Sequence, residues 1–364
     1  MSLSTHPTKA STVRKHVKKL DRIAVNMDAA KLPHSAGGSW MGRRGGDGMK
    51  TWQLNDLLNN EGFTLVKYKP GFNTVIIDKE ERMIAALIDK PADDGWPAVV
   101  EEAARCLRAV RVTGNANGAF HTEDASTRRG NFLQVPVGVS FGGGQKRPGN
   151  LYYHIRARRL IAQSILRNRA IQRIAGVQSS AFAFLNPKLF QRYTQVINSL
   201  FESQPNLVRN FRNSTFPAAS FNCGPASISF DHHDFNNLSF GPCALTPLGN
   251  FDYTLGGHLI LFELKLVLEF PPGTTVLLPS AALRHGNTAI QPGEDRMSIA
   301  QYGAGGLFRW SAYGFCSGKS LDSTAEGHAY RLSVDGGPGE RWMEGLKLYS
   351  TPNSLVSDHA EVSG

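Results

Sequence analysis

The chain has 364 residues, of which 41% are hydrophobic and 19% charged, a balance that allows a globular fold with a sizeable buried core. No apolar run approaches the roughly 20 residues of a membrane-spanning helix, and the first residues lack the apolar centre of a secretory signal. The four cysteines are widely spaced and form no Cys-x-x-Cys pair. This spacing argues against a zinc site or a disulfide framework and favours a reducing compartment.

The formal net charge of +10 is concentrated in two segments. Residues 1–50 hold ten Lys/Arg against three Asp, and residues 121–175 hold ten Lys/Arg against two acidic residues. Concentrated basic segments fit a polyanionic partner, although solubility alone explains such charge about equally well. The basic stretches within residues 14–19 also lead us to expect a nuclear location.

The first part of the chain predicts a mixed α/β organisation. Residues 1–50 are expected to be a basic, partly flexible N-terminal arm with one short amphipathic helix within 11–25. Residues 51–200 are expected to be an α/β supporting region. Its expected strands are 63–68, 74–77, 83–88 and 138–144, and its expected helices are 96–109, 152–174 and 187–201. The helix 152–174 carries six arginines, which suit phosphate contact or a solvated helix face.

Residues 201–320 differ, because short apolar stretches separated by turns dominate. This spacing is typical of a β-barrel or a double-stranded jelly roll. The expected strands are 226–230, 241–246, 258–270, 275–278, 289–290, 297–302 and 308–313. Residues 321–364 are polar and predict a loop-rich segment with one short ordered piece near 342–349.

A candidate metal centre begins with the sequence Phe-Asp-His-His-Asp at 230–234. In extended backbone, residues two apart point the same way, so His232 and Asp234 can bind one ion while His233 points elsewhere. His285 follows 51 residues after Asp234. Two histidines and one carboxylate form the facial triad of non-haem Fe(II) oxygenases, which leaves positions open for a cosubstrate and oxygen.

Arg296 gives this motif its context, because it follows His285 by 11 residues. In the strand expected at 297–302 and its flank, Arg296, Ser298 and Tyr302 share one face. A buried guanidinium beside a hydroxyl can hold the far carboxylate of a dicarboxylate such as 2-oxoglutarate. The alternative is an ordinary strand with an ion-paired arginine.

Residues 130–318 resemble the TET/JBP family of DNA-base oxygenases, particularly its basidiomycete fungal branch. The resemblance rests on the stretches 137–145, 256–259, 264–285 and 305–310, is weaker over residues 51–130, and does not extend to the arm or the tail. It implies an α+β protein with a double-stranded β-helix (jelly-roll) core, at 201–320, flanked by helices. Residues 51–320 are then expected to be one compact unit.

The resemblance also implies residue roles. His232, Asp234 and His285 match the iron ligands, and Arg296 and Ser298 match the pair that holds the distal carboxylate of 2-oxoglutarate. Asn237 matches a contact to the base edge, and Tyr302 matches the aromatic residue that stacks on the base. Ala304 departs from the pattern, because animal TET proteins have a base-contacting histidine there.

We therefore expect an Fe(II)- and 2-oxoglutarate-dependent dioxygenase that uses O2 to oxidise methylated DNA bases that are flipped out of the duplex. The expected substrate is 5-methylcytosine, with N6-methyladenine as a second candidate. The rival interpretations are an oxygenase acting on RNA or protein, and an inactive module that binds nucleic acid. His258 is expected to pack or hydrogen-bond within a strand, with support of the metal site as the alternative.

Overall fold

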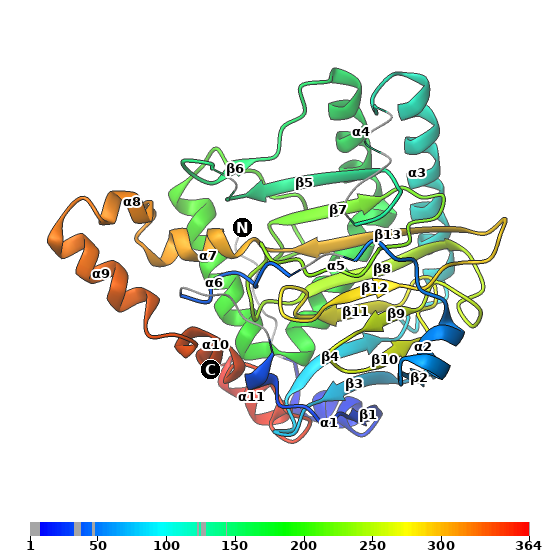
Figure 1. The fold of residues 1–364 in the computed structure, drawn as a ribbon, viewed down its shortest axis with the longest axis horizontal. Helices are drawn as coiled ribbons and strands as arrows, with labels where there is room; N and C mark the ends of the chain where they lie inside the picture. The colour runs from blue at the N-terminus through cyan, green and yellow to red at the C-terminus, as the bar shows by residue number, and fades with distance from the viewer. Residues whose placement is uncertain are drawn as a thin grey trace.

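The computed structural model describes residues 8–32, 38–45, 48–121, 124, 129–142 and 144–363, and it contains two β-sheets flanked by helices (Figure 1). The larger sheet has nine strands in the order β1-β3-β4-β11-β8-β13-β7-β5-β6. These strands are β1 Leu20–Ala24, β3 Asn73–Ile77, β4 Met83–Ile88, β5 Gln134–Ser140, β6 Gly149–Asn150, β7 Ala218–Asn222, β8 Cys243–Asn250, β11 Thr275–Leu278 and β13 Asp295–Tyr302.

The smaller sheet has four strands in the order β12-β9-β10-β2. They are β2 Thr64–Val66, β9 Leu259–Leu261, β10 Leu266–Leu268 and β12 His285–Asn287. From β7 onward the chain alternates between the sheets: β7 and β8 lie in the larger one, β9 and β10 in the smaller, β11 in the larger, β12 in the smaller and β13 in the larger. The expectation of a mixed fold with sheets flanked by helices is therefore confirmed.

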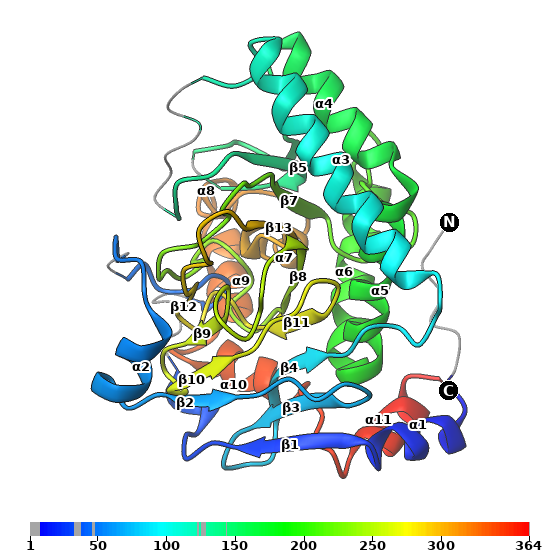
Figure 2. The ribbon, with the colours of Figure 1, turned by 90° about the vertical axis from the view of Figure 1, so that its right-hand side faces the viewer.

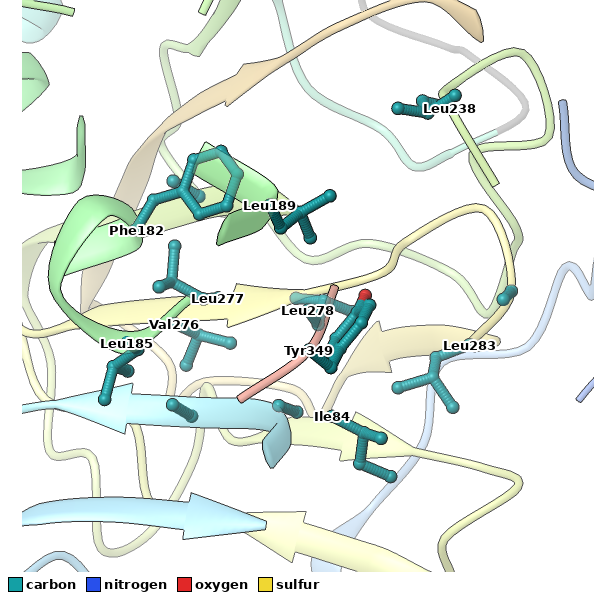
Figure 3. Packing of buried hydrophobic residues seen from close by; sticks show 14 of the residues in the cluster. Ile84, Phe182, Leu185, Leu189, Leu238, Val276, Leu277, Leu278, Leu283 and Tyr349 are labelled. Carbon is teal, nitrogen blue, oxygen red and sulfur yellow. The ribbon is translucent and has the colours of Figure 1, made fainter. Parts of the chain in front are cut away.

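Long helices cover the outer face of the larger sheet (Figure 2). They are α3 Trp96–Ala116, α4 Arg156–Arg167, α5 Arg169–Leu185 and α6 Pro187–Ser203. Phe182 and Leu185 of α5 are buried in the same cluster as Val276 and Leu277 of β11, as Figure 3 shows. No helix among the described residues is both long and apolar enough to cross a membrane.

Three local predictions were wrong. The single helix expected at 152–174 starts at Arg156 and breaks at Asn168, whose side-chain oxygen accepts from the Ile171 amide at 3.1 Å and begins a second helix. The strand expected at 308–313 is the helix α7 Gly305–Ala312, because a short buried apolar run suits either structure. The stretches 226–230 and 289–290 form no named strand.

The segment 321–364 is helical where we expected loops. After α8 Gly318–Leu321, it forms α9 Ala325–Asp335, α10 Glu340–Leu346 and α11 Leu355–Glu361. The Thr324 hydroxyl caps α9 by accepting from the Gly327 amide at 3.0 Å. Trp342, Leu346 and Leu355 are buried in the main core, and this packing supplies the stability that the short polar sequences lack alone.

The described part of the N-terminal arm belongs to the fold. The helix α1 Ala10–Val17 packs beside α11, and β1 pairs in parallel with β3 at the edge of the larger sheet. The turn η1 Ala29–Lys31 and the helix α2 Leu54–Asn60 follow. Residues 1–7, 33–37 and 46–47 lie outside the described residues. Within the stretch expected to be a basic, partly flexible arm, residues 8–32 therefore contribute a strand to the sheet edge and a helix that packs beside α11.

Candidate metal centre

The structure brings His232, Asp234 and His285 together in the interior. One ligand atom from each of these buried side chains lies within 4.8 Å of the others. The Nε2 atoms of His232 and His285 lie 3.6 and 3.9 Å from the two carboxylate oxygens of Asp234. This arrangement leaves room for one ion between two imidazole nitrogens and one carboxylate.

Backbone pairing explains how residues far apart in the sequence meet. The His232 amide donates to the His285 carbonyl at 2.9 Å, and the His285 amide donates back at 3.0 Å. Directly paired residues in an antiparallel bridge point to the same side, and the two imidazole rings lie 4.4 Å apart. Asp234, two residues after His232, follows onto that side, as the alternation in the sequence predicts.

The two imidazoles are oriented by main-chain carbonyls. Nδ1 of His232 donates to the Phe230 carbonyl at 2.7 Å, and Nδ1 of His285 donates to the Leu283 carbonyl at 2.9 Å. With Nδ1 protonated, the Nε2 lone pair of each ring points at the carboxylate. Burial lowers the pKa of both histidines, that of His232 to about 3, which keeps the rings neutral and able to bind a cation.

A second set of contacts fixes the same two segments from the opposite side. Asp231, which is 1% exposed, forms an ion pair with Arg284. Each partner directly precedes a histidine of the triad, so the pair joins the two segments in register. Trp52 donates through Nε1 to Asp231 at 3.2 Å, and His233 lies 3.3 Å from Glu263. These contacts hold the candidate ligands in position before any ion binds.

Arg296 and Ser298 lie on β13 and are both buried. The Arg296 Nη1 atom donates to the Ser227 carbonyl at 2.6 Å, whereas its Nε and Nη2 atoms have no hydrogen-bond partner among the described residues. Burial lowers the pKa of Arg296 to about 10. Ser298 accepts from the Asn222 side chain at 2.8 Å. A guanidinium with two unused donors in the interior is suited to bind an anion.

Two further polar residues lie in this region: His258, which was expected to pack or hydrogen-bond within a strand, and Arg129, for which the sequence predicted no role. His258 is fully buried, and its Nδ1 lies 2.8 Å from the Thr288 hydroxyl while its Nε2 has no hydrogen-bond partner among the described residues. Arg129 pairs with Asp234 at 2.6 Å and lines the small cavity beside the triad. No spacing rule marks Arg129, whereas the burial expected for His258 within an apolar strand was a usable signal.

The residues expected to contact a base lie at one end of this centre. Asn237 forms an antiparallel bridge with Ala304, two residues after Tyr302. The Asn237 side-chain amide donates to the Ser280 hydroxyl at 3.1 Å. Burial raises the pKa of Tyr302 to about 12; the charge of Arg129 lowers this pKa and that of Asp234 raises it. The structure therefore places Asn237 and Tyr302 on neighbouring segments beside the metal centre.

Comparisons with known proteins give one kind of match. No protein-family model and no curated protein sequence matches the chain. Among solved structures, the fold is similar to that of the Naegleria protein NgTET1 in complex with 5mC DNA. The two share 15% identity over 68% of this chain and 83% of that chain, with a TM-score of 0.40.

Proposed function

We propose that this protein is an Fe(II)- and 2-oxoglutarate-dependent dioxygenase that oxidises 5-methylcytosine in DNA to 5-hydroxymethylcytosine and further. N6-methyladenine is the second substrate of the proposal, and the nucleus is the proposed location. The observation that carries it is the convergence of His232, Asp234 and His285 in the interior, in a protein that also buries two unused Arg296 donor atoms on β13 of the larger sheet. These groups combine a facial metal site with a guanidinium that can bind an anionic cosubstrate.

The strand order supports a double-stranded β-helix as the core. After β8 the chain passes to the smaller sheet for β9 and β10, and β11, β12 and β13 then alternate between the two sheets; the bridge from His232 to His285 adds a short segment beside β12. The candidate metal ligands lie on the segment between β7 and β8, which carries His232 and Asp234, and on β12, which begins at His285.

The residues present fit an Fe(II) ion. Both imidazoles are oriented by their Nδ1 hydrogen bonds, so each offers a neutral Nε2 donor, and Asp234 offers a carboxylate oxygen. The three ligands come from one side, which leaves the other positions of an octahedral ion open. Together with 2-oxoglutarate and O2, a bound iron would supply the oxidising power to hydroxylate a methyl group.

The protein's own part with 2-oxoglutarate is binding and orientation. We assign the distal carboxylate to Arg296 and Ser298, because the Arg296 Nε and Nη2 donors are buried without a partner. The unpartnered His258 Nε2 supports the same assignment, since Arg296 is close enough to lower the pKa of His258. A carboxylate bound between them would use donors that are otherwise costly to bury.

The base contacts belong to Asn237 and Tyr302. The Asn237 amide offers one donor group and one acceptor, and cytosine and adenine both present an amino donor beside a ring-nitrogen acceptor. The Tyr302 ring can stack on either base. Ala304 has a smaller side chain than the histidine of the animal TET proteins, and on this ground we include N6-methyladenine.

The experiment offers the protein DNA duplexes that each carry one modified base, with Fe(II), 2-oxoglutarate and O2, and measures succinate and the product nucleosides by mass. We expect metal-dependent succinate formation coupled to loss of 5-methylcytosine, and His285→Ala should abolish both. The matched control is His328→Ala, which removes an exposed histidine of α9 that pairs with Asp322.

Each rival has its own outcome. Succinate formation without consumption of either methylated base would replace DNA by RNA or protein as the substrate. Absence of metal-dependent succinate, with nucleic-acid binding retained, would make the protein a catalytically inactive binding module. Wild-type activity in His285→Ala would remove the triad assignment.

A further inference from the structure

We propose that the rim segment, defined as residues 38–45 and 48–52, binds the phosphates of duplex DNA beside the flipped base. The N-terminal basic helix α1, in contrast, does not take part in this binding. This inference rests on the proposed function, because it identifies the surface that receives the same substrate. The inference assigns different roles to the cations of the rim segment and to those of α1, which the net charge of residues 1–50 does not distinguish.

The rim segment is attached to the outer side of the residues that carry the metal ligands. Met41 forms an antiparallel bridge with Leu238, and the Gly48 amide donates to the Asp231 carbonyl at 3.0 Å. Gly42 lies so close to the Ala281 carbonyl that an added Cβ atom would be 2.3 Å from it. With the Trp52 bond to Asp231, these contacts fix the segment along 231–238.

The cations of the rim segment point to solvent. Arg43, Arg44 and Lys50 are exposed, and no ion pair holds any of them within the described part of the chain. The Arg44 guanidinium lies 5.6 Å from the ring centre of Phe235, and the Lys50 ammonium lies 4.1 Å from that of Trp52. Aromatic rings thus restrict two of the cations while leaving their charge available.

Their position fits a polyanion beside the metal centre. Phe235 directly follows the candidate ligand Asp234, and Asn236 is exposed, so the ligand-bearing segment reaches the surface at this point. A base that enters the site brings its own phosphates to the surrounding surface. Met49, which is 79% exposed among these cations, offers an apolar contact for sugar or base.

The other basic group of residues 1–50 lies elsewhere. Arg14, Lys15 and Lys18 are exposed on or directly after α1, which packs beside α11 at the edge of the larger sheet (Figure 1). The strands β3, β4, β11 and β8 separate β1 from β13, a spacing of about 24 Å at about 4.8 Å per strand. This spacing exceeds the Debye length at physiological salt, so we expect charges at the β1 edge, where α1 lies, to act weakly on a polyanion bound at the far side of the sheet.

The test compares two triple variants that remove the same charge. Arg43→Gln with Arg44→Gln and Lys50→Gln neutralises the rim, and Arg14→Gln with Lys15→Gln and Lys18→Gln is the matched control. The affinity for a short duplex with one 5-methylcytosine is measured by fluorescence anisotropy at several salt concentrations. Each lost phosphate contact makes the negative slope of log affinity against log salt shallower by about 0.9. We therefore expect the slope to become shallower by about 2.7 in the rim triple variant and by less than about 0.9 in the control.

Two more measurements distinguish the loss of phosphate contacts from the loss of folded structure. Succinate formation without DNA should be unchanged in the rim triple, and the charge-preserving set Arg43→Lys, Arg44→Lys and Lys50→Arg should restore the slope. If the rim triple does not fold, the single variant Arg43→Gln, expected to lower the slope by about 0.9, gives the answer.

Equal slopes in the rim and control triples, or a wild-type slope in the rim triple, would overturn this inference and leave the proposed function intact. If the wild-type protein forms succinate but shows no salt-dependent affinity for duplex DNA, the DNA substrate itself is refuted.

Discussion

At Arg296, the proposed binding of a carboxylate would be coupled to the free energy of folding. Its side chain is 1% exposed and lies near the rings of Phe251 and Phe270, yet two of its nitrogens have no hydrogen-bond partner among the described residues. A buried charge without its partners is costly, so a bound carboxylate should stabilise the folded state as well as serve catalysis.

We predict that Arg296→Lys raises the KM for 2-oxoglutarate by roughly tenfold or more, because an ammonium cannot reproduce the guanidinium's paired donors. The affinity for DNA should change little. The matched control is Arg108→Lys, since Arg108 pairs with the neighbouring Asp295 on the outside of the molecule. Steady-state kinetics with varied 2-oxoglutarate decides the point, and an unchanged KM would exclude Arg296 from the cosubstrate site.

His258 gives a prediction about pH. Burial lowers its pKa to about 4, whereas an unfolded histidine has a pKa near 6.5. Between these values the unfolded chain binds a proton that the folded chain does not, so stability falls as the pH drops from about 6.5 to about 4.

The free energy of unfolding that is lost through protonation of His258 should be on the order of 3 kcal/mol. In His258→Asn this pH-dependent loss should be absent. Urea unfolding of the metal-free protein at neutral and at acid pH measures the difference between wild type and variant. If that difference is the same at both pH values, His258 does not titrate as we infer.

At the scale of elements, the turn that leads into β9 lies directly against the Arg296 side chain. Gly257 has φ +70°, and a Cβ atom there would lie 2.7 Å from the Phe251 ring and 3.2 Å from Cδ of Arg296. Gly293 also has a positive φ, of +85°, but an added Cβ would meet no atom within 4 Å. Comparing substitutions at these two glycines therefore distinguishes the effect of backbone strain from the effect of a contact with Arg296.

We predict that Gly293→Ala costs only the strain of the left-handed backbone, roughly 1–2 kcal/mol. Gly257→Ala should cost more and should also raise the KM for 2-oxoglutarate, because the new methyl group displaces Phe251 or Arg296. Thermal unfolding and kinetics on both variants test this. The same KM in both variants would show that the turn does not position Arg296.

Across the whole molecule, residues 8–32, 38–45 and 48–52 pack against or pair with the rest of the fold. Val13, Ala29, Leu32 and Trp40 are buried in the main core. Removing residues 1–50 therefore takes away a sheet edge and several buried side chains, each of which contributes about 1.5–3 kcal/mol when large and apolar.

We predict that the deletion unfolds the protein or abolishes succinate formation, even without DNA. The full-length α1 triple variant, which keeps the apolar contacts, should unfold at the wild-type temperature. Circular dichroism melting compares the two proteins. A deleted protein that melts and turns over 2-oxoglutarate normally would show that residues 1–50 are a separable arm.

Local sequence patterns predicted those parts of the fold whose stability is local. The strand Met83–Ile88 and the helix starts at Trp96 and Pro187 were predicted at the residues where the structure has them. The side chains of His232 and Asp234 point the same way, and this too follows from the alternation of extended backbone, which does not depend on any other segment of the chain.

Tertiary structure decided the rest, because the energies concerned come from contacts between distant residues. Gly305 and Gly306 begin a helix rather than a strand since their backbone packs against Trp40 and Phe141, and the tail is helical since Trp342 enters the core. The backbone bridge that brings His285 to His232 and the division of the basic residues between rim and sheet edge depend on strand order. The sequence by itself therefore determined which side chains can bind a metal and an anion. Only the tertiary structure decided which of them meet, because burial and pairing act between segments that no local pattern relates.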